Sequence, residues 1–278
     1  MATAPTFVDL LQAVATAKGS WLCVGLDVVI DRLPAGIPND AGGAWQFIEA
    51  IVESTSDLVC AYKPNFSFFE AMGVDGWRML HDLRRLIPDD VVLIADAKRG
   101  DIDSSAEAYA SAILDRMGFD AVTVNAYGGQ DCVVPFLDRS DRGVFVWTRS
   151  SNPGASEFQD LIVENDPLYL AIARRVMAWN RHGNCGLVVG ATYPDELAAV
   201  RKRAPSLPIL IPGVGAQAGD LEAAVRAGRS ESGGLALINA SRSVIYAGAD
   251  ADFRSEVRLA AEDLRGRINS ALTAGSEA

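Results

Sequence analysis

Eight short apolar runs, separated by longer amphipathic segments, restrict the folds open to this chain more than any other feature of its sequence. The runs are almost continuously apolar and do not alternate apolar with polar residues. This pattern is typical of parallel strands that are buried on both faces of a sheet. We expect strands at residues 21–27, 58–64, 91–96, 121–125, 144–148, 186–191, 208–213 and 235–241.

The segments between these runs repeat apolar residues at helical spacing. A helix or a short helical turn should therefore follow each strand. Pro88, Gly118, Gly183 and Gly228 stand where helices should end. We expect helices at residues 44–55, 76–87, 105–118, 167–182, 195–204 and 220–228, and a last one at about 252–270.

Eight strands that alternate with helices predict an α/β fold of the (β/α)8 type, the TIM barrel. We expect one barrel domain over residues 1–278, with an N-terminal capping helix at 6–18 and a frayed tail at 271–278. The connections 28–43 and 149–166 are long for a compact domain, so we expect them to be functional. An open doubly wound sheet is the alternative, but no GxGxxG motif follows the first strand.

The charge balance argues against nucleic acid as a partner. The chain carries 25 basic and 36 acidic residues, a net charge of −11, whereas nucleic-acid-binding proteins need basic surface to contact phosphates. Its four cysteines have no metal-ligand spacing, so we expect reduced thiols in a cytoplasmic protein and no metal site. The start of the chain lacks a secretion signal and no apolar run reaches ~18 residues, so we expect no membrane partner.

Charged residues gather at the carboxyl ends of the first three predicted strands, where TIM barrels build their active sites. Asp27 ends the first strand, Lys63 the second and Asp96 the third, and Lys98 and Asp101 follow closely. Because side chains alternate along an extended chain, Asp96 and Lys98 should both face the barrel mouth. Lysines flanked by carboxylates stay protonated in a partly dry pocket. Each such lysine is a ready proton donor and a poor base.

Two later strand ends suggest an anion site. Residues 213–219, GVGAQAG, place small residues after the seventh strand, where backbone N–H groups can approach an anion. Arg242 follows the eighth strand, and barrels often bind phosphate between these two loops. Tyr127, Trp147 and Arg149 end or follow the fourth and fifth strands and are candidates for lining the mouth. For Trp147, filling of the barrel interior is the alternative.

The segment DAKRGDI, residues 96–102, resembles the DxKxxD signature of the orotidine 5′-monophosphate decarboxylase family, in its DAKRGD variant. Other segments resemble the family in the same order along the chain, and the long DAKRGD and PGVGAQ segments are specific. The others are VGLD (24–27), YKPNFSFFE (62–70), VNAYGG (124–129), TRSSNPGA (148–155), VVGAT (188–192), IPGVGAQAGD (211–220) and NASRSVIYAG (239–248).

The resemblance implies a homodimeric, cofactor-free carboxy-lyase that converts orotidine 5′-monophosphate to uridine 5′-monophosphate in pyrimidine biosynthesis. It implies that Lys98 is the general acid that protonates C6 of the pyrimidine, with Asp96 near the substrate carboxylate. Lys63 is implied to pair with Asp96 and to touch the ribose, whose hydroxyls Asp27 binds. Asp101 is implied to reach into the site of the neighbouring subunit.

The resemblance also implies five further contacts with the substrate. Ile102 and Ser105 flank the ribose and the carboxylate pocket, and Ser151 contacts the pyrimidine. Gln217 bridges the pyrimidine and the phosphate, and Arg242 binds the phosphate. Together these residues would hold the substrate along its whole length.

Two other functions fit the same barrel. A magnesium-dependent phosphosugar decarboxylase or aldolase shares the DxKxxD pattern, but that group has a glutamate at the end of the second strand. This chain has Lys63 there, and a cation at that place opposes a divalent ion. A non-catalytic nucleotide-binding barrel should have lost some of the charges, because buried charges are costly. The cofactor-free decarboxylase is therefore favoured.

Overall fold

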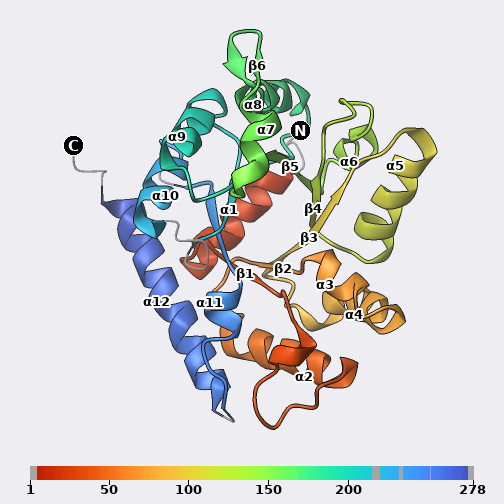
Figure 1. Cartoon of the computed structure of the whole chain (residues 1–278), viewed down its shortest axis with the longest axis vertical. Helices are drawn as coiled ribbons and strands as arrows, with labels where there is room; N and C mark the ends of the chain where they lie inside the picture. The colour runs from red at the N-terminus through yellow and green to blue at the C-terminus, as the bar shows by residue number, and fades with distance from the viewer. Residues whose placement is uncertain (1–4, 215–219, 232–233, 251, 275–278) are drawn as a thin grey trace.

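The computed structural model describes residues 5–214, 220–231, 234–250 and 252–274. Its eight barrel strands are β1 (Leu22–Gly25), β2 (Ala61–Lys63), β3 (Val92–Arg99), β4 (Ala121–Val124), β5 (Gly143–Arg149), β8 (Cys185–Val189), β9 (Ile209–Pro212) and β10 (Ala236–Ala240). They are all parallel and close in the order β1-β10-β9-β8-β5-β4-β3-β2 (Figure 1). The predicted TIM barrel is confirmed, and the open sheet is wrong.

Helices surround the barrel and follow the strands in sequence (Figure 1). The α-helices are α1 (Phe7–Lys18), α2 (Ala41–Thr55), α3 (Phe66–Glu70), α4 (Val74–Leu86), α5 (Asp103–Ala110), α6 (Val134–Leu137), α7 (Ser156–Gln159), α8 (Leu168–Trp179), α9 (Pro194–Arg203), α10 (Leu221–Gly228), α11 (Arg242–Ile245) and α12 (Phe253–Thr273). Short 3-10 helices η1 (Ile30–Arg32) and η3 (Pro153–Ala155) and a π-helix η2 (Ser111–Arg116) complete the set.

The N-terminal helix α1 closes the barrel at the end where the strands begin. Thr6 and Asp9 form a capping box that starts the helix. The ring of Phe7 packs edge-on against Phe145 of β5, with 6.0 Å between the ring centroids. Phe7 and Leu11 are fully buried in the same apolar cluster as Phe145. The opposite end of the barrel is left for the active site.

The strands are continuously apolar because each strand contributes side chains to two separate apolar clusters. Val144 and Val146 of β5 belong to the large cluster between strands and helices, whereas Phe145 between them belongs to the cluster inside the barrel. Because neighbouring side chains of a strand point to opposite faces, both faces are covered only if nearly every residue is apolar. The barrel interior is therefore packed and forms no pore.

The long connections contain more structure than the sequence indicated. Residues 149–166 carry η3, α7 and most of a small antiparallel hairpin, whose strands are β6 (Ile162–Val163) and β7 (Asp166–Pro167). Residues 28–43 include η1. The predicted tail needs correction, because α12 continues to Thr273 and buries Ala271 against the core. Residues 275–278 lie outside the described part of the chain.

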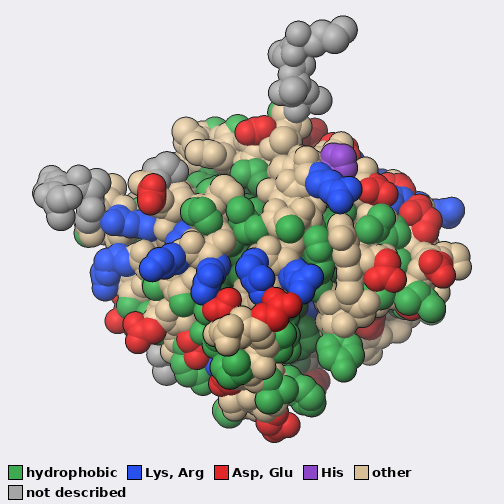
Figure 2. Space-filling model, turned by 90° about the horizontal axis from the view of Figure 1, so that it is seen from above, with side chains coloured by type: hydrophobic (Ala, Val, Ile, Leu, Met, Phe, Trp, Pro, Cys, Tyr) green, Lys and Arg blue, Asp and Glu red, His purple; other side chains and the backbone are tan. Residues whose placement is uncertain are grey.

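Basic and acidic side chains are intermixed on the molecular face in Figure 2, with apolar side chains between them. Ion pairs on the surface of the described chain include Arg174 with Glu164 and Arg203 with Asp166. Within the described ranges, no helix is both long and apolar enough to cross a membrane.

Candidate active site

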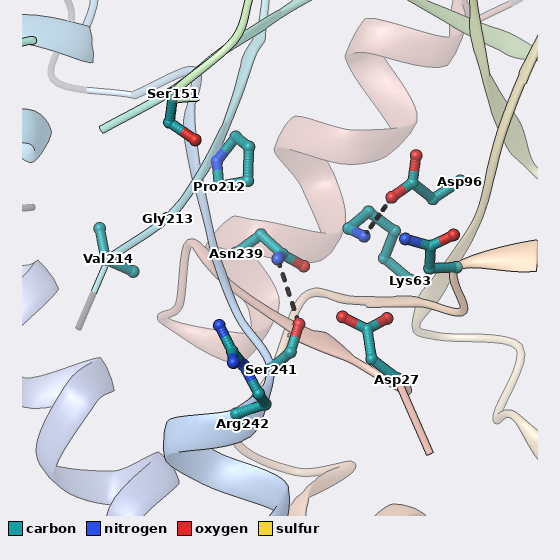
Figure 3. Close-up of a pocket in the computed structure, with 11 residues that line it drawn as sticks. Asp27, Lys63, Asp96, Ser151, Pro212, Gly213, Val214, Asn239, Ser241 and Arg242 are labelled. Atoms are coloured by element: carbon teal, nitrogen blue, oxygen red, sulfur yellow. Dashed lines mark hydrogen bonds and ion pairs between the residues drawn. The ribbon is translucent and has the colours of Figure 1, made fainter. Parts of the chain in front are cut away.

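Two adjoining cavities occupy the carboxyl end of the barrel. The first has a volume of about 210 Å³, and the second about 300 Å³. They share Lys63, Asp96, Ser151 and Pro212. The first cavity is lined by Asp27, Lys63, Asn65, Asp96, Ser151, Pro212, Gly213, Val214, Asn239, Ser241 and Arg242, most of which Figure 3 labels. Strand ends from several parts of the barrel therefore converge on one site.

An ion cluster lies where the two cavities meet. The Lys63 ammonium is 2.8 Å from Oδ2 of Asp96, and the Lys98 ammonium is 2.7 Å from Oδ1 of the same carboxylate. Lys63 and Asp96 are only 3% and 9% exposed. The Lys98 side chain is 39% exposed and reaches the second cavity. The structure thus brings together three of the residues that the sequence singled out.

The charges of neighbouring groups determine which side chains of this cluster are ionised. Burial by itself disfavours the Asp96 carboxylate, but the charges of Lys63 and Lys98 outweigh burial and hold the pKa of Asp96 well below its usual range. Burial likewise opposes the Lys63 cation. The negative charges of Asp96 and Asp27 overcome that effect and raise the pKa of Lys63. Asp96 is therefore an anion and Lys63 a cation at neutral pH.

Lys98 reaches Asp96 through an unusual backbone conformation. Its φ is +47°, in the left-handed region that lysine rarely adopts. The pairing of β3 with β4 is irregular between Ala95 and Arg99. The regular alternation that we expected for Asp96 and Lys98 is therefore wrong, although both side chains do face the mouth. The Lys98 ammonium also lies 6.0 Å from the ring centroid of Trp147, which lines the second cavity and packs on the inner cluster.

The first cavity has an anionic and a cationic part. The Asp27 carboxylate faces the same space as Lys63, while Arg242 lies on the other side of Asn239 (Figure 3). Oδ1 of Asp27 is buried and has no hydrogen-bond partner within the described residues. Such an atom can accept hydrogen bonds from a bound hydroxyl. Arg242 supplies a cation for an anionic group.

Three predicted site residues line neither cavity of their own chain. They are Asp101, Ile102 and Ser105. Ile102 is 61% exposed and Ser105 is also exposed. Asp101 uses one carboxylate oxygen to accept the N–H of Ile102 at 2.8 Å. We expected the helix to begin at residue 105, and it begins two residues earlier, at Asp103. Gln217 lies outside the described residues.

Sequence reasoning missed several polar residues of the site, among them Asn65, Asn239 and Thr123. Asn65 and Asn239 line the first cavity and Thr123 lines the second. Asn65 and Asn239 were inside quoted motifs, YKPNFSFFE and NASRS. Thr123 carried one usable signal, because it is the only polar residue within the otherwise apolar strand β4. Tyr127 lines neither cavity and is 91% exposed.

Arg149 lies at the start of the loop that carries Ser151 and forms an ion pair with Asp160 of that loop at 3.0 Å. It is buried at the end of β5 and forms two hydrogen bonds with the carboxylate of Glu196. Its guanidinium also lies 5.3 Å and 5.4 Å from the ring centroids of Tyr169 and Tyr193. A buried, fully engaged arginine of this kind is a rigid support for the neighbouring loop.

Comparison with known proteins agrees with this geometry. A model of the "Orotidine 5'-phosphate decarboxylase / HUMPS family" matches residues 20–254. An orotidine 5′-phosphate decarboxylase of Thermomicrobium roseum is 52% identical over 266 residues, which are 95% of each chain. Another, of Herpetosiphon aurantiacus, is 49% identical and covers 92% of this chain and 95% of its own.

The fold has a similar counterpart among solved structures. The OMP decarboxylase of Leishmania donovani superimposes with a TM-score of 0.84 and is 39% identical. The match covers 96% of this chain and 98% of the Leishmania chain. Sequence and fold agree over nearly the full length, and this chain belongs to the orotidine 5′-phosphate decarboxylase / HUMPS family.

Proposed function

We propose that this chain is a carboxy-lyase that converts orotidine 5′-monophosphate to uridine 5′-monophosphate, a step of pyrimidine biosynthesis. Relatives at about 50% identity over nearly the whole chain carry the name of that activity. The observation that carries the proposal is the Lys63–Asp96–Lys98 cluster between the two cavities. It offers a protonated amine beside a space large enough for a pyrimidine ring.

Lys98 is the proton donor in this proposal. When the bond between C6 and the carboxylate breaks, carbon dioxide leaves and the electron pair stays on C6. An N–H of the Lys98 ammonium then gives its proton to C6, and solvent restores the ammonium. The cation stabilises a charge that exists only near the transition state, which is where such an interaction accelerates a reaction. Asp96 is the counter-ion of that ammonium.

The remaining contacts divide between the two ends of the substrate. Asp27 receives the ribose hydroxyls, which its unpartnered Oδ1 supports. Arg242 holds the phosphate, and Ser151, which lines both cavities, contacts the pyrimidine. Gln217 is proposed to bridge pyrimidine and phosphate. Binding at the remote phosphate can orient the ring over Lys98.

The site is completed by a second subunit in this proposal. Asp101, Ile102 and Ser105 line neither cavity of their own chain but follow Lys98 closely in sequence. A homodimer would place Asp101 in the neighbouring site, near the ammonium of Lys98. The four cysteines are free thiols, which supports a reducing, cytoplasmic compartment.

The metal-dependent alternative is less well supported. The ammonium of Lys63 is buried against Asp96 and occupies the place where that group of enzymes carries a metal-binding glutamate. A fixed cation there repels a divalent ion. In a non-catalytic barrel, the buried charges of Lys63 and Asp96 would have no function, although burying them costs folding free energy.

The reaction is tested by following the ultraviolet absorbance of orotidine 5′-monophosphate with the purified protein, with and without a chelator. Decarboxylation at the same rate in both samples is the expected result. Loss of activity with the chelator would favour the metal-dependent enzyme, and binding of uridine 5′-monophosphate without turnover would favour the non-catalytic barrel.

The role of Lys98 is tested by Lys98→Ala. We expect the variant to lose nearly all turnover, at least about a thousandfold, because the charge on C6 loses its stabilising cation. Binding of uridine 5′-monophosphate should persist, since the ribose and phosphate contacts remain. Full activity in this variant would refute the proton-donor role.

A further inference from the structure

The pairing of β3 with β4 is interrupted beside the ion cluster. Ala95 is paired with Val122 and Arg99 with Val124. Four steps along β3 therefore face only two steps along β4, and β3 bulges at this point. A bulge takes backbone groups out of the regular ladder, and a buried N–H without a partner is costly. The backbone N–H of Lys98 is one of the groups displaced in this way.

The hydroxyl of Thr123 fills the interruption. Thr123 lies opposite the bulge between the two paired positions and is 1% exposed. Its Oγ1 accepts the backbone N–H of Lys98 at 3.0 Å. The same hydroxyl donates its hydrogen to Oδ1 of Asp96 at 3.0 Å. That oxygen also accepts the Lys98 ammonium at 2.7 Å.

One side chain thus holds Lys98 at both ends. The direct hydrogen bond fixes the backbone where φ is +47°. The hydrogen bond to Asp96 fixes the carboxylate that receives the ammonium. The hydroxyl donates its single hydrogen to Asp96 and accepts the N–H of Lys98 with a lone pair. Valine has the same shape as threonine but no hydroxyl, so it can form neither hydrogen bond.

We propose that Thr123 is a positioning residue for the decarboxylation, because its hydroxyl holds Lys98 in the left-handed conformation and aims its ammonium into the substrate cavity. This inference rests on the proposed function. Thr123 acts through Lys98 and Asp96. Since Lys98 acts on charge that develops in the transition state, loss of the hydroxyl should lower kcat and leave substrate binding nearly unchanged.

The test compares Thr123→Val with Thr123→Ser. Thr123→Val should lower kcat for orotidine 5′-monophosphate by about tenfold to a hundredfold, because two buried hydrogen bonds are lost. KM, and the affinity for uridine 5′-monophosphate, should change by less than about threefold. Thr123→Ser keeps the hydroxyl and should retain at least about a third of the kcat of the parent.

Thr148→Val is the matched control. Thr148 is also 1% exposed and lies on the adjacent strand β5, and among the described residues its hydroxyl has one partner, the nearby carbonyl oxygen of Val146 at 2.8 Å. It lines neither cavity. The control removes the same atoms at a similar depth, so its kcat should stay within about threefold of the parent.

A second readout follows the backbone itself. Hydrogen exchange of the Lys98 amide should be at least about tenfold faster in Thr123→Val than in the parent, and near the parental rate in Thr123→Ser. If Thr123→Val does not fold, Thr123→Ala replaces it in both measurements. A parental kcat in the variant without the hydroxyl, or an equal loss in Thr123→Ser, would overturn the inference. Absence of decarboxylation in the parent would instead overturn the proposed function.

Discussion

Oδ2 of Asp96 lies 2.8 Å from Nζ of Lys63, and both side chains are withdrawn from solvent at the ends of adjacent strands. The other oxygen of Asp96 binds Lys98. One carboxylate therefore serves as counter-ion for two ammonium groups, one buried and one at the edge of a cavity. Removal of its charge should affect both folding and catalysis.

Asp96→Asn tests this shared role. The variant leaves the buried cation of Lys63 without its hydrogen-bonded counter-charge, so the free energy of unfolding should fall by about 3 kcal/mol. It also releases Lys98, and kcat/KM should fall by about a thousandfold. Denaturant titration and steady-state kinetics measure the two effects. Asp90→Asn is the control, because Asp90 pairs with Lys18 but its side chain is 69% exposed, and it should cost less than about 1 kcal/mol.

The lowered pKa of Asp96 predicts an acid dependence of stability. An unfolded aspartate titrates near a pKa of about 3.9, whereas the folded carboxylate titrates lower. Between these two values the unfolded state binds more protons, so stability falls as pH falls. Below about pH 4, unfolding free energies of the parent and of Asp96→Asn should therefore converge. A constant difference down to the folded pKa would contradict the ion cluster.

The charged residues at the strand ends were predictable from the sequence, because a strand is recognised by its local pattern of apolar residues. Asp27, Lys63 and Asp96 each follow an apolar run, and parallel strands in a closed barrel must bring such ends together. The fold itself was predicted for the same reason, since eight apolar runs need both faces covered. Long-range pairing of β3 with β4 was not required for these inferences.

The details of the ion cluster were not predictable from the sequence. Lys98 adopts a positive φ because β3 bulges against β4, and a bulge depends on tertiary pairing. Thr123 becomes important only through that bulge. The start of α5 at Asp103 is two residues earlier than expected, and its φ of +44° is a backbone conformation that the helical pattern of the sequence does not reveal.

Arg201 provides a test of stability away from the active site. It is 8% exposed and donates to the carbonyl oxygens of residues 204, 205, 207, 228 and 235. Burial lowers its pKa to about 10. Arg201→Met removes this donor from all five carbonyl groups, and the free energy of unfolding should fall by about 3 kcal/mol.

The control for this prediction lies on the same helix. Arg203 pairs with Asp166, but its side chain is 46% exposed. Arg203→Met should therefore cost less than about 1 kcal/mol. Both variants should keep the parental kcat per folded molecule, since neither residue lines a cavity. Equal losses of stability in the two variants would show that the buried network around Arg201 contributes little.

Asp101 gives the sharpest test of the proposed dimer. If it completes the site of the partner subunit, Lys98→Ala and Asp101→Ala homodimers each have two defective sites. A hybrid of the two has one site with both defects and one intact site. Random reassociation makes about half of the dimers hybrids, so about a quarter of the parental activity should return on mixing. Lys98→Ala mixed with Asp96→Asn is the control, because both residues belong to the same subunit's site and no hybrid has an intact one. If the first mixture stays inactive while hybrids form, Asp101 acts within its own chain. If Asp101→Ala alone keeps the parental activity, Asp101 is not part of the site.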